Sequence, residues 1–179
     1  MGLSALSIFP AFPYKGRTEA TGTSADLYHQ PHRELRRALL ATVLEAGDVG
    51  PDDDAGIEAL RRHWIAAASL LRDHHDREDA FVDPLIDRFV LHARSNVDQD
   101  HATIGRGLEE LDSQAARLCD SDESGRGERL HRFYRDLCRF SIVYLEHMAY
   151  EEEVVMPELR AALADDELAA VASAIHAPH

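Results

Sequence analysis

A His and a Glu four residues apart occur twice in the chain, as His74–Glu78 and His147–Glu151. In each copy a second acid follows the Glu, and a proline stands six residues after it. On an α-helix, residues i and i+4 lie on the same face, one turn apart. Each motif therefore presents an imidazole and a carboxylate in the same direction, which is half of a two-metal site.

Four segments have the apolar spacing of amphipathic helices. The first is predicted to begin at an N-cap in Thr23–Ser24 and to end near Ala46, with Gly47 as its C-cap. Its inward face comprises Tyr28, His32, Leu35, Leu39 and Val43. The second follows an Asp N-cap, and its inward face comprises Ile57, Leu60, Trp64, Ala67, Leu71, His74, Glu78, Phe81 and Leu85. Pro84 kinks this helix or starts its last segment.

The third and fourth segments repeat this arrangement. Residues 95–98 resemble a capping box, and the inward face that follows comprises Val97, His101, Ile104, Leu108, Leu111, Ala115 and Leu118. The inward face of the fourth helix comprises Leu130, Phe133, Leu137, Phe140, Tyr144, His147, Glu151 and Val154. Because a lone His precedes each His-x-x-x-Glu motif, the chain reads as one helical hairpin used twice.

These segments predict an all-α fold, an up-down-up-down four-helix bundle over residues 23–179. Residues 1–22 are proline-rich and aperiodic, which indicates an irregular N-terminal arm. Residues 165–174 are predicted to form a short C-terminal helix, with Asp165 and Asp166 in its first turn. No segment alternates with a period of two, so strands are not expected.

The composition is that of one globular domain with an acidic surface. The chain has 179 residues, 45% of them hydrophobic, with a net charge of -14. This charge argues against nucleic acid and anionic membranes as partners, and no apolar run is long enough to span a bilayer. We interpret Cys119 and Cys138 as buried thiols in a reducing compartment, so a cytoplasmic protein is expected. A homo-oligomer is possible.

Each of the four inward faces contains one His where a bundle core normally has an apolar residue. Buried imidazoles need hydrogen bonds, and buried carboxylates need a proton or a cation. The sequence therefore predicts a metal site, suited to iron, manganese or zinc. The alternative is a hydrogen-bonded polar layer. The candidate metal ligands are His32, His74, Glu78, His101, His147 and Glu151.

Other polar residues are interpreted differently. Glu128 and His131 form an isolated Glu-x-x-His pair, so the ferritin-like arrangement of two such pairs is rejected. Tyr28 and Tyr144 either face the site or donate their hydroxyl protons to backbone carbonyls. Residues interpreted as surface, solvated or otherwise not ligands are His29, His63, His75, Asp79, His92, His131, Glu152, His176 and His179.

With these motifs, residues 24–175 resemble the hemerythrin-like, or HHE cation-binding, domains. The resemblance implies a four-helix bundle around two non-haem iron ions. His32 and His74 would bind one iron, and His101 and His147 the other. Glu78 and Glu151 would bridge them, together with an oxo or hydroxo group.

One position departs from the oxygen-carrying hemerythrins, which have a second His one turn after the lone His of the third helix. Gly105 stands there in this chain, so one iron is expected to have a vacant or water-filled position. We therefore expect a protein that binds or senses O₂ or a related small molecule, NO or peroxide. The alternatives are a di-iron enzyme with catalase-like or oxidase activity and a metal storage or structural protein.

The first prediction concerns this open position. We expect Gly105→His to prolong the lifetime of bound O₂ and to weaken peroxide turnover, because an added imidazole would fill the position. Stopped-flow spectroscopy and O₂ release from peroxide measure the two effects. No change in either would contradict the role given to Gly105.

Overall fold

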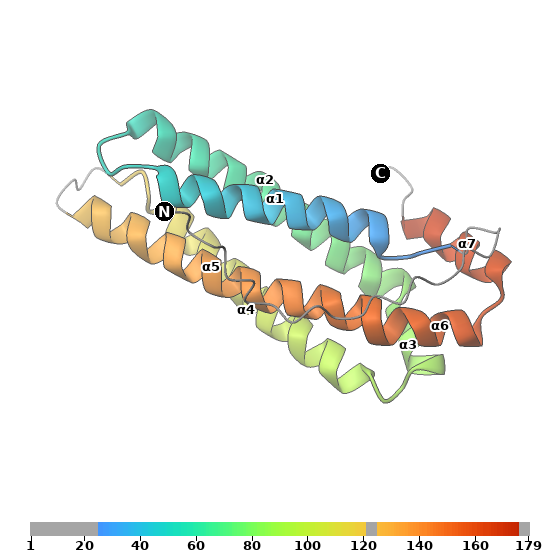
Figure 1. The fold of residues 1–179 in the computed structure, drawn as a ribbon. Coiled ribbons are helices and arrows are strands. Elements are labelled where there is room, and N and C mark those ends of the chain that lie inside the picture. The colour runs from blue at the N-terminus through green and yellow to red at the C-terminus, as the bar shows by residue number, and fades with distance from the viewer. Residues whose placement is uncertain (1–24, 121–124, 176–179) are drawn as a thin grey trace, which may run out of the picture.

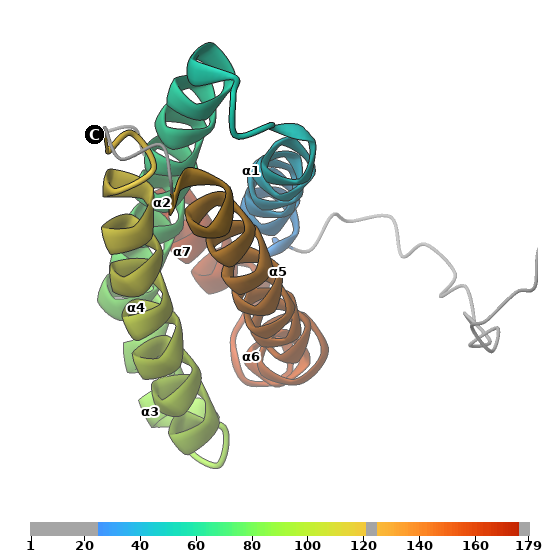
Figure 2. The ribbon, with the colours of Figure 1, turned by 90° about the vertical axis from the view of Figure 1, so that its left-hand side faces the viewer.

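The computed structural model describes residues 25–120 and 125–175, and within these ranges it contains helices and no strands. Four long helices form its body: α1 (His29–Asp48), α2 (Asp54–Phe81), α4 (Arg94–Ala116) and α5 (Arg126–Tyr150). Helix α1 contacts α2 and α5, and α4 contacts the same two helices, so the four close into a ring (Figure 1, Figure 2). The predicted all-α bundle is confirmed, while the predicted arm, 1–22, lies outside the described residues.

Shorter elements gather at one end of the bundle (Figure 1). They are α3 (Asp83–Phe89), the π-helical turn η2 (Glu151–Val155), α6 (Met156–Ala162) and α7 (Asp165–Ile175). Pro84 and Pro157 stand in the first turns of α3 and α6, where a missing N–H leaves no hydrogen bond broken. Pro84 therefore starts the last segment, one of the two predicted outcomes. The short C-terminal helix is also where the sequence placed it.

The two ends of α1 differ from those predicted. The predicted cap Thr23–Ser24 lies outside the described residues, and Asp26 Oδ1 accepts the N–H groups just before and at the start of α1. Gly47 was wrongly predicted as a C-cap, because α1 continues to Asp48. Gly47 instead permits a close approach, since a Cβ there would lie 3.3 Å from Tyr134 Cε2.

The predicted capping box at 95–98 is also wrong. Helix α4 begins at Arg94 without a side-chain cap. Arg94 instead forms ion pairs with Asp83 (2.6 Å) and Asp98 (2.5 Å). The contact with Asp83 joins the start of α4 to α3 at the end of the bundle.

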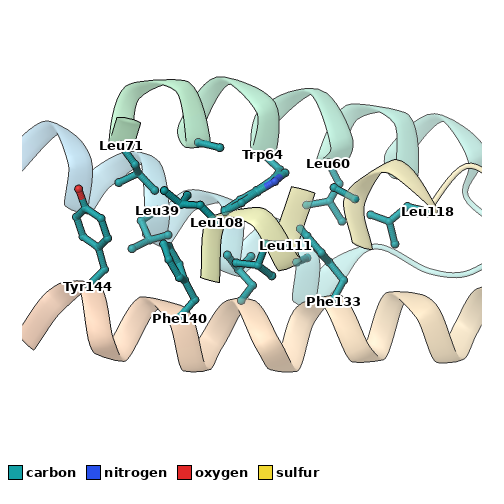
Figure 3. Close-up of a cluster of buried hydrophobic side chains, with 14 of the residues drawn as sticks. Leu39, Leu60, Trp64, Leu71, Leu108, Leu111, Leu118, Phe133, Phe140 and Tyr144 are labelled. Atoms are coloured by element: carbon teal, nitrogen blue, oxygen red, sulfur yellow. The ribbon is translucent and has the colours of Figure 1, made fainter. Parts of the chain in front are cut away.

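Two apolar clusters fill the interior. The bundle cluster lies between the four long helices, with Trp64 packed edge-on against Phe133 and Phe140 (Figure 3). The end cluster lies beneath α3, α6 and α7, with Leu27 and Tyr28 from the chain before α1. Its other fully buried members are Val82, Ile86, Val90, Ala93, Val97, Val155, Met156, Leu159, Leu168 and Ile175.

Two predicted inward positions, Phe81 and Val154, shift where the helices change course, and two others, Val43 and Leu85, are half-buried. Phe81 is 41% exposed, because α2 ends there and Val82 takes the buried position. Val154 is half-buried and Val155 is buried, because the Met156 N–H bonds to the Glu151 carbonyl five residues back. A π turn contains one more residue than predicted, so the inward face moves by one position. Val43 is half-buried and packs at the edge of the bundle cluster.

The cysteine prediction is partly wrong. Cys119 is exposed and donates to Glu58 Oε2 at 3.3 Å, while Cys138 is half-buried. Neither is in a disulfide.

None of the helices over 25–120 and 125–175 combines the length and apolar character needed to cross a membrane.

Two glycines on α4 give a matched stability test. A Cβ at Gly105 would have no atom of the described chain within 4 Å, whereas one at Gly107 would lie 2.6 Å from Phe140 Cδ2. Gly105→Ala should raise the free energy of unfolding by about 1 kcal/mol through helix propensity. Gly107→Ala should lower it, because displacing the buried ring costs about 1–3 kcal/mol. Urea unfolding measures both, and equal gains would contradict this packing.

Candidate metal centre

A buried polar layer separates the two apolar clusters. Along α1, Tyr28 belongs to the end cluster, His32 to the polar layer and Leu35 to the bundle cluster. On α2, on α4 and on α5 with η2, the polar residues of the layer likewise lie between members of the two apolar clusters. The layer contains all six predicted ligands, of which His101 is 14% exposed at its side chain and the others are buried: His32, His74, Glu78, His147 and Glu151.

The first half of the layer joins α1, α2 and η2. His32 Nε2 lies 3.1 Å from His74 Nε2 and 3.4 Å from Glu151 Oε2. His74 Nε2 lies 3.0 Å from Glu78 Oε1. One ligand atom from each of these four residues falls within a group whose atoms are all within 4.8 Å of one another. Two imidazoles and two carboxylates therefore converge on a space of the size that one metal ion needs.

The second half joins α2, α4 and α5, and it contains a residue that the sequence interpretation missed. His75 forms a group with Glu78, His101 and His147, again within 4.8 Å. Its ring stacks on that of His101 with centroids 4.5 Å apart and on Tyr144 at 5.6 Å. His75 is half-buried, so its prediction as a surface residue is wrong. Both halves contain Glu78, which makes that carboxylate the link between them.

The His32 imidazole is held by hydrogen bonding to residues outside the polar layer. His32 Nδ1 donates to Glu152 Oε1 at 2.9 Å, and Arg36 donates to both Glu152 oxygens at 2.7 and 3.0 Å. Burial opposes ionisation of Glu152, but the hydrogen bonds from Arg36 and His32 hold its pKa below the usual value. The bond to Nδ1 fixes the tautomer and directs Nε2 into the layer. Glu152 was predicted to be solvated, and this contact corrects that interpretation.

The second pair of imidazoles has looser outer contacts. His101 Nδ1 lies 3.5 Å from Asp79 Oδ1, and His147 Nδ1 lies 3.8 Å from Asp100 Oδ2. Asp79 is 62% exposed at its side chain, as predicted for a solvated residue. These separations are too long for strong hydrogen bonds.

The two buried carboxylates do not both ionise readily in the protein alone. Burial raises the pKa of Glu151 well above its usual value, and the nearby charge of Glu78 adds to this effect. For Glu78, burial is outweighed by the positive field of His74 and its neighbours, so its pKa is lowered. A cation between them would permit both to be charged at neutral pH.

Several buried polar atoms of the layer have no hydrogen-bond partner within the described residues. Although His74 Nε2 approaches Glu78 Oε1 closely, neither Glu78 oxygen accepts a well-aligned hydrogen bond. The other such atoms are Tyr28 Oη, His75 Nε2, His101 Nε2, Tyr144 Oη, His147 Nδ1 and Nε2, and Glu151 Oε2. Unsatisfied buried groups are costly, and metal coordination would satisfy the imidazole and carboxylate atoms among them. The donor set therefore fits a pair of metal ions.

The two tyrosines are among the layer's nearest neighbours. The Tyr28 ring lies 4.9 Å from that of His32, and Tyr144 lies 6.0 Å from His147. Burial, followed by the charges of the two layer carboxylates, raises the pKa of both phenols well above normal. Neither hydroxyl bonds to a carbonyl of the described chain, so the second of the two predicted arrangements, a hydrogen bond to a backbone carbonyl, is not found there.

A groove of about 420 Å³ borders the first half of the layer. His74 lines it, between residues of α1, α2 and the last residue of α7. Its other lining residues are Gln30, Pro31, Glu34, Leu35, Leu70, Asp73, Arg77 and Ile175. Solvent therefore reaches the edge of the His74 ring, while the interior of the layer stays enclosed.

The remaining histidines of the described chain that were predicted not to be ligands lie on the surface. They are His29, His63, His92 and His131, while His176 and His179 lie outside the described residues. The surface position of His131 agrees with the rejection of the ferritin-like arrangement.

Fold and site together define a helical-bundle, cation-binding protein. Residues 23–139 and 92–178 match the Hemerythrin HHE cation binding domain family. Each match contains His101 and one of the two His-x-x-x-Glu motifs. The chain belongs to the hemerythrin HHE cation-binding domain family. No curated protein sequence matches it.

The buried imidazoles give the metal-free protein a pH-dependent stability. Burial, opposed in part by Glu78, lowers the pKa of His147 to about 3 and that of His75 to about 4, from 6.5. At pH values between these lowered pKa values and 6.5, the unfolded chain binds protons at the two imidazoles and the folded chain does not. The free energy of unfolding therefore falls as the pH is lowered through 6.5. Glu151, whose pKa is raised, acts in the opposite direction, because the folded chain keeps its proton at pH values where the unfolded chain has lost it. We expect the free energy of unfolding to fall below pH 6.5 by up to about 1.4 kcal/mol per pH unit for each of the two histidines, less the contribution of Glu151.

Urea unfolding of the metal-free protein across this range measures the slope. His147→Gln should flatten it even if overall stability changes, whereas exposed His131→Gln should leave it unaltered. An unchanged slope in His147→Gln would show that this imidazole is protonated in the folded protein.

Proposed function

We propose that this hemerythrin-like protein holds two non-haem iron ions in the polar layer. His32 and His74 bind the first iron, and His101 and His147 bind the second. Glu78 and Glu151 bridge the two, with an oxo or hydroxo group as a third bridge. The observation that carries the proposal is the pair of donor groups that share Glu78. Both buried Glu78 oxygens lack a hydrogen-bond partner within the described residues.

The function that this centre supports best is binding or sensing of O₂ or a related small molecule, NO or peroxide. Bound iron supplies a reversible change of redox state and a place for a small ligand. The apolar clusters on both sides of the layer exclude bulk water. The Tyr28 and Tyr144 hydroxyls are buried without a hydrogen-bond partner within the described residues, and they would donate hydrogen bonds to a ligand in the layer. We place the protein in the cytoplasm without nucleic-acid or membrane partners, and self-association is compatible with this role.

Peroxide disproportionation is the second candidate function. The observation that favours it is the partial exposure of the His101 side chain, 14% against 5% for His74 in the first half. Small polar molecules would then reach the metals from the α4 side.

Metal analysis and optical spectroscopy test the centre. After anaerobic Fe(II) loading and exposure to air, we expect two iron ions per chain and an oxo-to-iron charge-transfer band. Glu78→Gln should remove most of the iron, because it takes a charge from both halves. Exposed Glu153→Gln, on the same turn as Glu151, is the matched control and should retain the iron. Trace iron and no band in the unmodified protein would contradict the proposal.

Hydrogen peroxide separates the two candidate functions. A sensor should bind or consume peroxide stoichiometrically, whereas a catalase-like enzyme should release O₂ over many turnovers. We expect ligand binding to dominate over a slow turnover, and sustained O₂ release over many turnovers would favour the enzyme.

A further inference from the structure

The two halves of the polar layer differ in three independent ways, and together these differences bear on how metal is held. This inference rests on the proposed metal centre. It concerns how strongly the chain's own residues grip each metal position.

The first difference is in the outer contacts. In the first half, His32 is fixed by a 2.9 Å hydrogen bond to Glu152, which the Arg36 guanidinium clamps through both oxygens. In the second half, the nearest outer carboxylates are 3.5 and 3.8 Å from the ring nitrogens of His101 and His147. A preorganised imidazole loses little freedom when it binds a metal, and outer contacts of this kind are worth about 10–100-fold in metal affinity.

The second difference is in charge and burial. Both layer carboxylates approach His32 Nε2, Glu151 at 3.4 Å and Glu78 at 3.9 Å. The compact second group contains Glu78 as its one carboxylate, with three imidazoles, while Glu151 Oε2 lies 3.4 Å from His147 Nε2 as well. The four donors of the first group are all buried, whereas His75 and His101 are partly exposed. A cation in the first half would therefore meet less water.

The third difference is the extra imidazole. His75 comes from α2, next in sequence to His74, yet it faces the opposite half of the layer. Its Nε2 is buried without a partner within the described residues, and its ring is held between His101 and Tyr144. Gly105 stands one turn after His101 on α4, and His75 of α2 gives the second half a third imidazole.

We propose that the centre has one tightly held and one exchangeable metal position, and that His75 is a ligand of the exchangeable one. The first position uses His32, His74 and both carboxylates, with Glu152 and Arg36 as positioning residues. The second depends on His75, His101 and His147. The protein with one metal is then a distinct state, populated when metal is scarce.

Anaerobic cobalt(II) titration tests this, read by calorimetry and by the visible d–d absorption. Wild type should bind two ions in two steps, the second about 10-fold or more weaker than the first. His75→Gln should weaken the second step by at least about 10-fold and leave the first unchanged. Glu152→Gln should weaken the first step, with a shifted spectrum for the first ion. Exposed His63→Gln, on the same helix, is the matched control.

Circular dichroism checks that each variant keeps its helices. Two equal steps in wild type, or a second step unaffected by His75→Gln, would overturn the inference while leaving the metal centre intact. Loss of the first step in His75→Gln would also overturn it. Binding of no cobalt by wild type would instead overturn the proposed function.

Discussion

The structure depends on one constraint, the burial of ionisable side chains in a layer between two apolar clusters. The two carboxylates of the layer are shielded from water, because the bundle cluster covers one side and the end cluster the other. Glu78 and Glu151 face each other at its centre, and burial makes their joint ionisation unfavourable. A cation removes this conflict, so the same charges that weaken a metal-free bundle become favourable when metal binds.

The surrounding elements are arranged to keep this layer in register. Prolines six residues after each motif Glu start α3 and α6, which cap the layer with the end cluster. The π turn at Glu151–Val155 joins α5 to α6, and its first and last residues, Glu151 and Val155, both face inward. Such turns are frequent at functional sites because they reorient a side chain without breaking the helix.

The sequence predicted the four long helices and placed the six donor residues on their inward faces. The spacing of the apolar residues identifies the buried face of a helix, and the polar residues at the same spacing then share that face. It failed where tertiary contacts override the local pattern. His75 looked like a surface residue beside the ligand His74, but it packs into the second half of the layer between His101 and Tyr144. The doubled His74–His75 pair was the available signal, since adjacent residues on a central helix can face two neighbouring helices. Val154 failed because a π turn has no clear sequence signature, and Glu152 because its contact with His32 spans 120 residues.

The most direct test of the account is a crystal structure of the iron-loaded protein with anomalous scattering data collected at the iron edge. The account predicts two anomalous peaks in the polar layer, about 3.5–4 Å apart, one beside His32 and His74 and one beside His101 and His147. A single peak, or peaks outside the layer, would contradict the claim that these buried groups form a two-metal centre.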